Sequence, residues 1–481
     1  MIKFNYTNLL KIVFMKKKYV SIFFSLIVFC ICFFIINKYH NHIPIHENTI
    51  TDYIQFDDLP FYRDYFIFYD LTYSFLFFIM IFSFLDKIEN SFLSYNLKII
   101  WIIKNLISLF LIIIYEKNTG LDQVYYFDII NNEKSWVHHF GYINDYINFD
   151  NATSNYLLIF NYLNIFLFNT WFAIKLFLNL FYLAIIYLSY KIYLKINKYD
   201  STIVFYLFAL FPSLLLFTSI ITKDLLIVFY IMVSLHCVQE IRKELNKNIK
   251  YFIIIAICIF LITTIRVWMG PLILISLITP YIFGYFFKFF KFFKSYNHFG
   301  FLLFFILIFT SLLFFLESNI WNDFQIKLIV KQFDRIHNWH AYDHNIYSVI
   351  GENTENIKYF LINDFWRMMF LSIFNPFLNH LTKIQFYPFI LENILIIFLI
   401  FYSFLNKKFF LDKIILALIF LVLGYSILYS HAGGFLNAGT SLRYAMQVKY
   451  PLFIYLISLN MSSLEVLKKK FITFYLKNFD K

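Results

Sequence analysis

Charged side chains stand directly beside long apolar runs at four places in this chain. Asp122 follows the third apolar run, and Lys223 with Asp224 stands at the start of the sixth. Arg266 ends the seventh run, and Arg443 leads into the last. A carboxylate can take the proton of an attacking hydroxyl, and a guanidinium or ammonium group can hold a phosphate. The set predicts group transfer from a lipid phosphate, with Asp122 as the base, Asp224 as a second acid or metal ligand, and Lys223, Arg266 and Arg443 as phosphate ligands.

Three of these residues also have an ordinary structural interpretation. Asp122 suits a loop in water, and Asp224 suits the first turn of a helix, where a carboxylate is favourable. Arg266 suits a side chain that extends to the membrane surface. Because charged groups are costly in a bilayer, their gathering at the mouths of several spans favours a cavity with a function.

The composition is that of a membrane protein. Of 481 residues, 61% are hydrophobic and 15% are charged, and the mean hydropathy is +0.67. In a soluble protein, about a quarter of the residues are charged. We therefore expect an all-α polytopic fold with about twelve transmembrane helices, in the apolar runs 20–37, 66–85, 99–115, 169–190, 201–219, 224–239, 251–267, 271–287, 299–316, 389–405, 411–429 and 446–460.

Positive charge sets the expected orientation. Three lysines at 16–18 precede the first run, and basic clusters follow the fourth, sixth and eighth runs. Because basic residues stay on the side of synthesis, we expect both termini in the cytoplasm of a bacterium, with the chain in its inner membrane and the large loops outside. No cleavage site follows the first run, which is expected to be a retained signal anchor. The net charge of +12 thus reports topology, and no nucleic-acid partner is expected.

Four regions follow from this map. They are a three-span region with the anchor (1–115), a membrane core with the first acidic outer loop (116–316), a large outer loop with an interfacial helix (317–388) and a three-span region with a basic tail (389–481). Two half-apolar outer segments, 155–168 and 368–388, predict helices that lie along the outer membrane surface.

Other classes of function lack their signals. The chain has ten glycines and no glycine-rich phosphate loop, which argues against ATP-driven transport. It also lacks an internal repeat, and its charges lie at one rim, which disfavours the alternative of a transporter or lipid-glycan flippase. Lys104 lies one turn inside a cytoplasmic span end and is expected to extend to that surface. The four cysteines all lie in apolar runs and are expected to be small core side chains.

Histidines of the late outer loop offer a weaker candidate site. His337, His340 and His344 are spaced three and four apart, so on a helix they would share one face and could bind a divalent metal. Their surroundings, rich in Asn, Trp and Tyr, favour a solvated loop instead. A divalent metal is therefore an open possibility as cofactor, and no other cofactor is indicated.

A longer order of features points to a family. A loop with Gly120-x-Asp122-x-x-x-Tyr126 comes first, then an interfacial helix and the segment 169–179, which opens a span; Phe-Pro-Ser at 211–213 and Lys-Asp at 223–224 follow. Over residues 116–290 this order resembles the GT-C class of polytopic glycosyltransferases, such as protein O-mannosyltransferases and lipid A aminoarabinose transferases. The resemblance implies a sugar donor linked to polyprenyl phosphate, used on the outer face, with Asp122 and Asp224 matching the family's acids. Lys175 stands where members often have Arg.

The chain departs from this family at two points. The acidic loop follows the third span instead of the first, and Gln123 stands where a second acid is common. Both departures fit equally well the O-antigen-type polymerases and ligases of polysaccharide assembly. The outer cavities of those enzymes are lined by arginines, and Arg266 and Arg443 of this chain would suit such a cavity. We expect a glycosyltransferase that acts on a lipid or surface-glycan acceptor, with a polysaccharide polymerase or ligase as the alternative.

Overall fold

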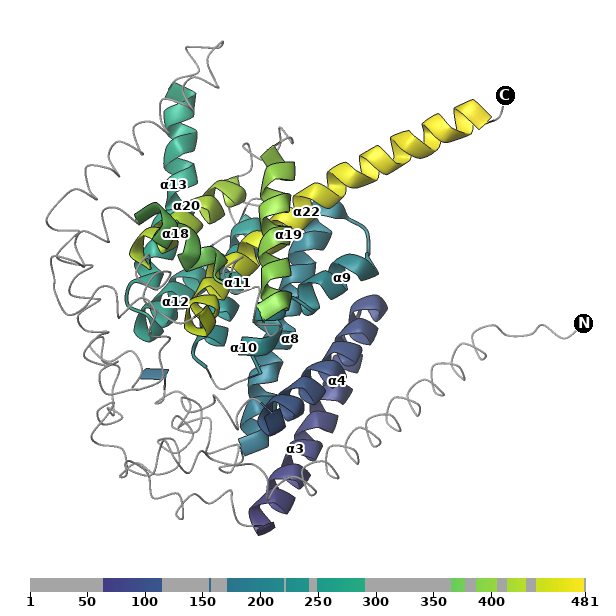
Figure 1. Cartoon of the computed structure of the whole chain (residues 1–481), viewed down its shortest axis with the longest axis vertical. Coiled ribbons are helices and arrows are strands. Elements are labelled where there is room, and N and C mark those ends of the chain that lie inside the picture. The colour runs from purple at the N-terminus through teal and green to yellow at the C-terminus, as the bar shows by residue number, and fades with distance from the viewer. Residues whose placement is uncertain are drawn as a thin grey trace, which may run out of the picture. The chain divides into compact units, whose positions relative to one another are not determined.

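The computed structural model describes nine parts of the chain, and every regular element in them is helical, with no strand among these residues. The all-α class is thereby confirmed for this part of the chain (Figure 1). The described residues are 64–114, 155–156, 171–219, 222–241, 249–289, 365–376, 386–404, 413–429 and 438–479. They divide into two compact units: unit 1 takes its residues from 1–187 and 215–225, and unit 2 takes its residues from 188–214 and 226–481.

Unit 1 is built on α3 (Asp64–Phe84), the short η4 (Leu85–Lys87), α4 (Ser91–Ile114) and the first part of α8 (Trp171–Asn197). The Trp101 indole N–H donates to the Phe78 carbonyl at 3.3 Å, and the two rings stack with centres 5.6 Å apart. The Asn179 amide donates to Asn105 at 2.8 Å and to Ser108 at 3.0 Å. Such polar contacts hold apolar helices together where lipid supplies no hydrophobic driving force.

Unit 2 is organised around the first half of α22 (Ala438–Phe479), which packs against α18 (Phe365–Phe374), α19 (Tyr387–Phe404) and α20 (Lys413–Leu428). Almost every side chain from 445 to 460 is buried, so α22 forms the core of the unit and runs beside α19 (Figure 1). The other helices are α9 (Thr202–Ala209), α10 (Pro212–Phe217, shared with unit 1), α11 (Asp224–Ile241), α12 (Ile249–Ile265), α13 (Met269–Phe289), α18 (Phe365–Phe374), α19 (Tyr387–Phe404) and α20 (Lys413–Leu428).

Some of the twelve expected transmembrane helices have the length and the apolar composition to span a membrane. Three segments are long and apolar enough to cross a bilayer: Ser91–Leu111, Phe172–Asn197 and Asp224–Ile241. Four shorter apolar helices lie in α12, α13, α19 and α20. The expected runs 20–37 and 299–316 lie outside the described residues. The total of twelve spans therefore stays a prediction.

One expected transmembrane helix is wrong, because the structure divides it into two helices. The run 201–219 is not a single helix, because α9 ends at Ala209, the chain turns at Leu210 and Phe211, and α10 begins at Pro212. Proline has no backbone N–H, and its ring disfavours helical geometry at the residue before it. Pro212 thus stands at the first position of a new helix, where proline is well suited.

Candidate functional site

The corner between α12 and α13 fixes the position of Arg266. Its backbone N–H still donates to the Ile262 carbonyl at 2.7 Å, which continues the α12 pattern past the helix end. Gly270 lets α13 begin directly against α12, because a Cβ at this position would lie 1.9 Å from the Thr263 hydroxyl oxygen. Arg266 is 7% exposed. It is buried within the protein, so the interpretation that it extends to the membrane surface does not hold.

Arg443 comes to the same place from the first turns of α22. The guanidinium carbon of Arg266 lies 3.9 Å from the centre of the Tyr444 ring, and that of Arg443 lies 5.3 Å from it. The two guanidinium carbons are therefore at most about 9 Å apart. Tyr429, just after α20, adds a second ring, whose centre is 5.8 Å from the Arg266 carbon and 6.0 Å from the Tyr444 centre. We call these four residues the arginine site.

The arginine site combines positive charge with access from outside unit 2. A ring face attracts a cation through its quadrupole. The N–H donors of a guanidinium lie in the plane of the group, so a ring against its face leaves their directions unblocked. That fork matches two oxygens of a phosphate or carboxylate. Arg266 is buried, whereas Arg443 and Tyr444 are partly exposed. The arrangement is suited to binding an anion, since two neighbouring cations favour one between them.

Lys223 and Asp224 belong to unit 1, at the turn that leads into α11. Asp224 is the first residue of the helix, as expected, and it is completely buried, whereas Lys223 is partly buried. The Thr222 hydroxyl donates to the Phe217 carbonyl at 3.2 Å and fixes the turn. Of the three cations assigned to phosphate, the structure thus brings Arg266 and Arg443 together in unit 2.

The expectation for Lys104 is wrong. It lies near the middle of α4 and is completely buried. Its amine donates to the Leu215 carbonyl at 2.7 Å, to the Thr218 hydroxyl at 2.6 Å and to the Ser219 hydroxyl. Three donors thus meet three oxygens. These hydrogen bonds satisfy the Lys104 ammonium inside the unit, so the side chain does not extend to the membrane surface. They also anchor the turn ahead of Asp224.

A buried ion pair in unit 2 was missed from the sequence. Lys449 of α22 lies 2.8 Å from the Glu392 carboxylate of α19, and both side chains are completely buried. Ser213 donates to the same carboxylate through its backbone N–H at 2.8 Å and its hydroxyl at 3.0 Å. Lys449 also donates to the Asn393 amide oxygen at 2.7 Å. The available signal was a charge inside each of the runs 389–405 and 446–460, where ionisable residues are rare and functional.

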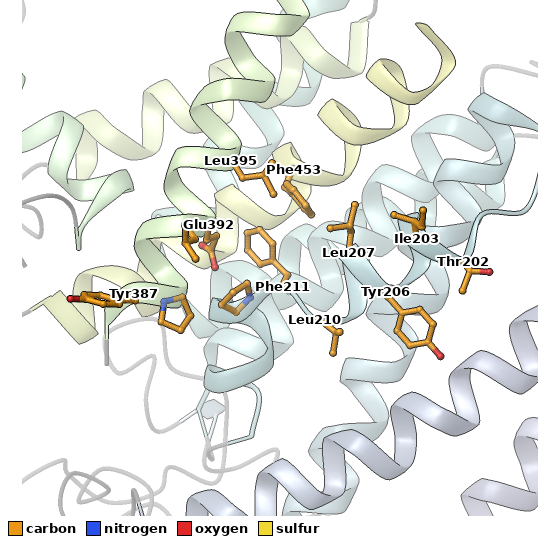
Figure 2. A pocket seen from close by; sticks show the side chains of 13 residues that line it. Thr202, Ile203, Tyr206, Leu207, Leu210, Phe211, Tyr387, Glu392, Leu395 and Phe453 are labelled. Atoms are coloured by element: carbon orange, nitrogen blue, oxygen red, sulfur yellow. The ribbon is translucent and has the colours of Figure 1, made fainter. Parts of the chain in front are cut away.

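An apolar groove of about 720 Å³ lies between α9 and α19. Figure 2 shows Ile203, Tyr206 and Leu207 on the α9 side and Leu395 on the α19 side. Phe211 and Phe453 pack against each other with ring centres 4.7 Å apart and form the floor. Glu392 lines one part of the groove. Its volume is in the range of ligand-binding pockets, about 300–1,000 Å³.

The predicted base and the predicted histidine site fall on residues that the structure does not describe. Asp122, His337, His340 and His344 lie outside the described residues. Within the described ranges, no three His, Cys, Asp or Glu side chains are grouped to hold a metal ion. Cys237 and Cys258 are buried free thiols, which confirms their role as core side chains.

Comparisons with protein-family models, curated proteins and solved structures found no match for this chain. Its function is therefore argued from its own residues.

Proposed function

We propose that this chain is a membrane glycosyltransferase that takes a sugar from a polyprenyl-phosphate-linked donor. It transfers the sugar to a lipid or surface-glycan acceptor at the outer face of the bacterial inner membrane, within a fold of about twelve spans. The convergence of Arg266 and Arg443 on the Tyr444 ring is the observation that carries the proposal. Two guanidinium groups held among apolar helices suit the phosphate of a lipid-linked substrate.

The reaction is an in-line displacement at the anomeric carbon. The acceptor hydroxyl oxygen forms a bond to that carbon, and the bond between the carbon and the phosphate oxygen breaks. The electron pair leaves with the lipid phosphate, where the two arginines stabilise the developing charge. The hydroxyl proton goes to a carboxylate. Asp122 is our assignment for this base, and Asp224 is our assignment for a second acid.

A polysaccharide polymerase or ligase is the second candidate. Joining two lipid-linked glycans requires places for two lipids. The apolar groove beside Glu392 shares only α22 with the arginine site, since its other lining residues come from α9, α10, α19 and the turn between α9 and α10, and this favours a second place for a lipid. The arginine site would have the same role in both reactions.

Substitution of Arg443 tests the proposal. We expect Arg443→Ala to lower transfer by about 100-fold, the usual effect of removing one group that stabilises transition-state charge. Arg443→Lys should also be impaired, since an ammonium cannot copy the guanidinium fork. Because the contact tightens as the phosphate leaves, the loss should fall mainly on kcat.

Transfer should be measured in nanodiscs over a range of polyprenyl-phosphate-sugar concentrations. Lys250→Ala, at the exposed start of α12, is the matched control and should transfer at the wild-type rate. Wild-type transfer by both Arg266→Ala and Arg443→Ala would contradict the proposal.

A further inference from the structure

The ring of Tyr444 is the common neighbour of the two arginines. The guanidinium carbon of Arg266, from the corner between α12 and α13, lies 3.9 Å from the ring centre, and that of Arg443 lies 5.3 Å from it. Both distances fall within the range of about 6 Å over which a ring attracts a cation. Consecutive side chains of a helix point about 100° apart, so the approach of Arg443 is not given by its place next to Tyr444 in the chain. The ring thus links a cation of α22 to a cation of another helix pair.

The Tyr444 ring is in turn held by aromatic contacts. Tyr429 meets it edge-on, with the two planes at 69° and the ring centres 6.0 Å apart. Tyr429 stacks on Tyr425 at 4.8 Å, and Tyr425 is completely buried in α20. Edge-on and stacked pairs are favourable arrangements of rings. A row of three rings therefore ties Tyr444 to the core of unit 2, and the ring can fix the position of what lies against it.

The two guanidinium groups need such a support because they carry like charges. They are at most about 9 Å apart, and charges of the same sign repel more strongly away from water. The quadrupole of the ring attracts both cations and so offsets their repulsion. A ring carries no net charge, so it does not cancel the positive charges as a carboxylate in its place would. Tyr444 can thus hold the pair together and preserve its attraction for an anion.

We infer that Tyr444 is a positioning residue, whose ring sets the spacing of Arg266 and Arg443 so that they share one anion. The inference rests on the proposed function and adds to it a residue that acts through the arginines. The ring is the part that acts, and the hydroxyl is not required. Phenylalanine should therefore replace Tyr444, whereas leucine, which is apolar but has no ring, should not.

Binding of polyprenyl phosphate to the full chain in nanodiscs tests the inference. We expect Tyr444→Phe to bind with wild-type affinity. Tyr444→Leu should bind about tenfold more weakly, since one ring loses its contacts with two cations. Phenylalanines with increasing numbers of ring fluorines, placed at position 444, keep the shape of the ring but weaken its negative face. The affinity should fall step by step along this series, which a purely structural role of the ring would not produce.

A double variant shows whether the ring acts through the arginines. Once Arg266 is removed, Tyr444 has no pair of cations left to space. The double variant Tyr444→Leu with Arg266→Ala should therefore bind within about threefold of Arg266→Ala alone, because residues that serve one site are not additive.

Tyr450→Leu is the matched control on the same helix. Tyr450 is buried, its ring lies 5.3 Å from that of Phe211, and its hydroxyl is 3.0 Å from the Ser189 hydroxyl. This variant should unfold at a lower temperature than the wild type. Below that temperature it should bind polyprenyl phosphate with wild-type affinity, which separates a loss of stability from a loss of positioning.

Three results would overturn the inference. Wild-type affinity throughout the fluorinated series and in Tyr444→Leu would show that the ring does not position the arginines. Equal losses in Tyr444→Phe and Tyr444→Leu would show that the hydroxyl is the group that matters. A further tenfold loss in the double variant would show a role independent of Arg266. Wild-type affinity in both Arg266→Ala and Arg443→Ala would instead contradict the proposed function, and the inference with it.

Discussion

Lys104 in unit 1 and Lys449 in unit 2 are both completely buried in apolar helices, yet their charges are met in different ways. Lys104 donates to three neutral oxygens, lies over the Tyr182 ring at 4.6 Å and is close enough to Lys175 to be repelled by it. Lys449 is paired with the Glu392 carboxylate, which Ser213 also binds. One lysine is satisfied by dipoles and the other by a counter-charge.

The difference shows what each buried cation contributes. The Lys104 contacts tie α4 to the turn ahead of α11, and its three donors are all used within the protein. The Lys449 pair joins α22 to α19, and through Ser213 to the start of α10. The arginines of unit 2 differ from both lysines in their surroundings, because Arg266 and Arg443 lie close to the ring of Tyr444, and a ring face attracts a cation. The proposed function assigns the phosphate to the two arginines, and the contacts of the two lysines indicate a structural role for them.

The largest effect on stability is expected at Lys449. Lys449→Met leaves the Glu392 carboxylate buried without its counter-charge and should cost about 3–5 kcal/mol. The double variant Lys449→Met with Glu392→Gln should recover most of this loss, since the amide is neutral and its oxygen can still accept from Ser213. Thermal unfolding in detergent measures both. A double variant no more stable than Lys449→Met would show that the pair is not the source of the cost.

A smaller effect is expected at Lys104. Lys104→Met removes three hydrogen bonds, but it also removes a buried charge and its repulsion by Lys175, so the cost should be about 1–2 kcal/mol. Two of the three oxygens left behind keep a contact with each other, because the Ser219 hydroxyl donates to the Leu215 carbonyl at 2.8 Å. The same unfolding assay applies. If Lys104→Met costs more than Lys449→Met, the contrast between dipole and counter-charge is wrong.

The sequence was a good guide to the helices and a weaker guide to their partners. The runs 251–267 and 271–287 predict α12 and α13 to within two residues, because hydropathy and the Gly270-Pro271 corner are local signals. Hydropathy cannot detect the break before Pro212, since Leu210 and Phe211 are as apolar as the helices around them. When the residues at a helical break are themselves apolar, the hydropathy of the run does not fall at the break.

The candidate site could be predicted only in part for the same reason. Arg266 and Arg443 attract notice as cations at span ends, but only the packing of α22 beside the α12–α13 corner brings them to one ring. Glu392 and Lys449 come from helices far apart in the chain, so no spacing rule links them. Lys104 was misjudged because its partners, at 215–219, are neutral oxygens with no charge to suggest the pairing.

The dissociation constant for polyprenyl phosphate in nanodiscs is the most direct measurement of the arginine site. It should be determined for the wild type, Arg266→Ala, Arg443→Ala and the double variant. Free polyprenyl phosphate is the leaving group of the proposed reaction and carries the charge that develops in the transition state. We therefore expect each single substitution to weaken its binding by about tenfold or more, since hydrogen bonds to charged groups contribute about 1.5–3 kcal/mol. Because both residues serve one site, the effects should not be additive in the double variant. Wild-type affinity in all three variants would show that these arginines hold no donor phosphate.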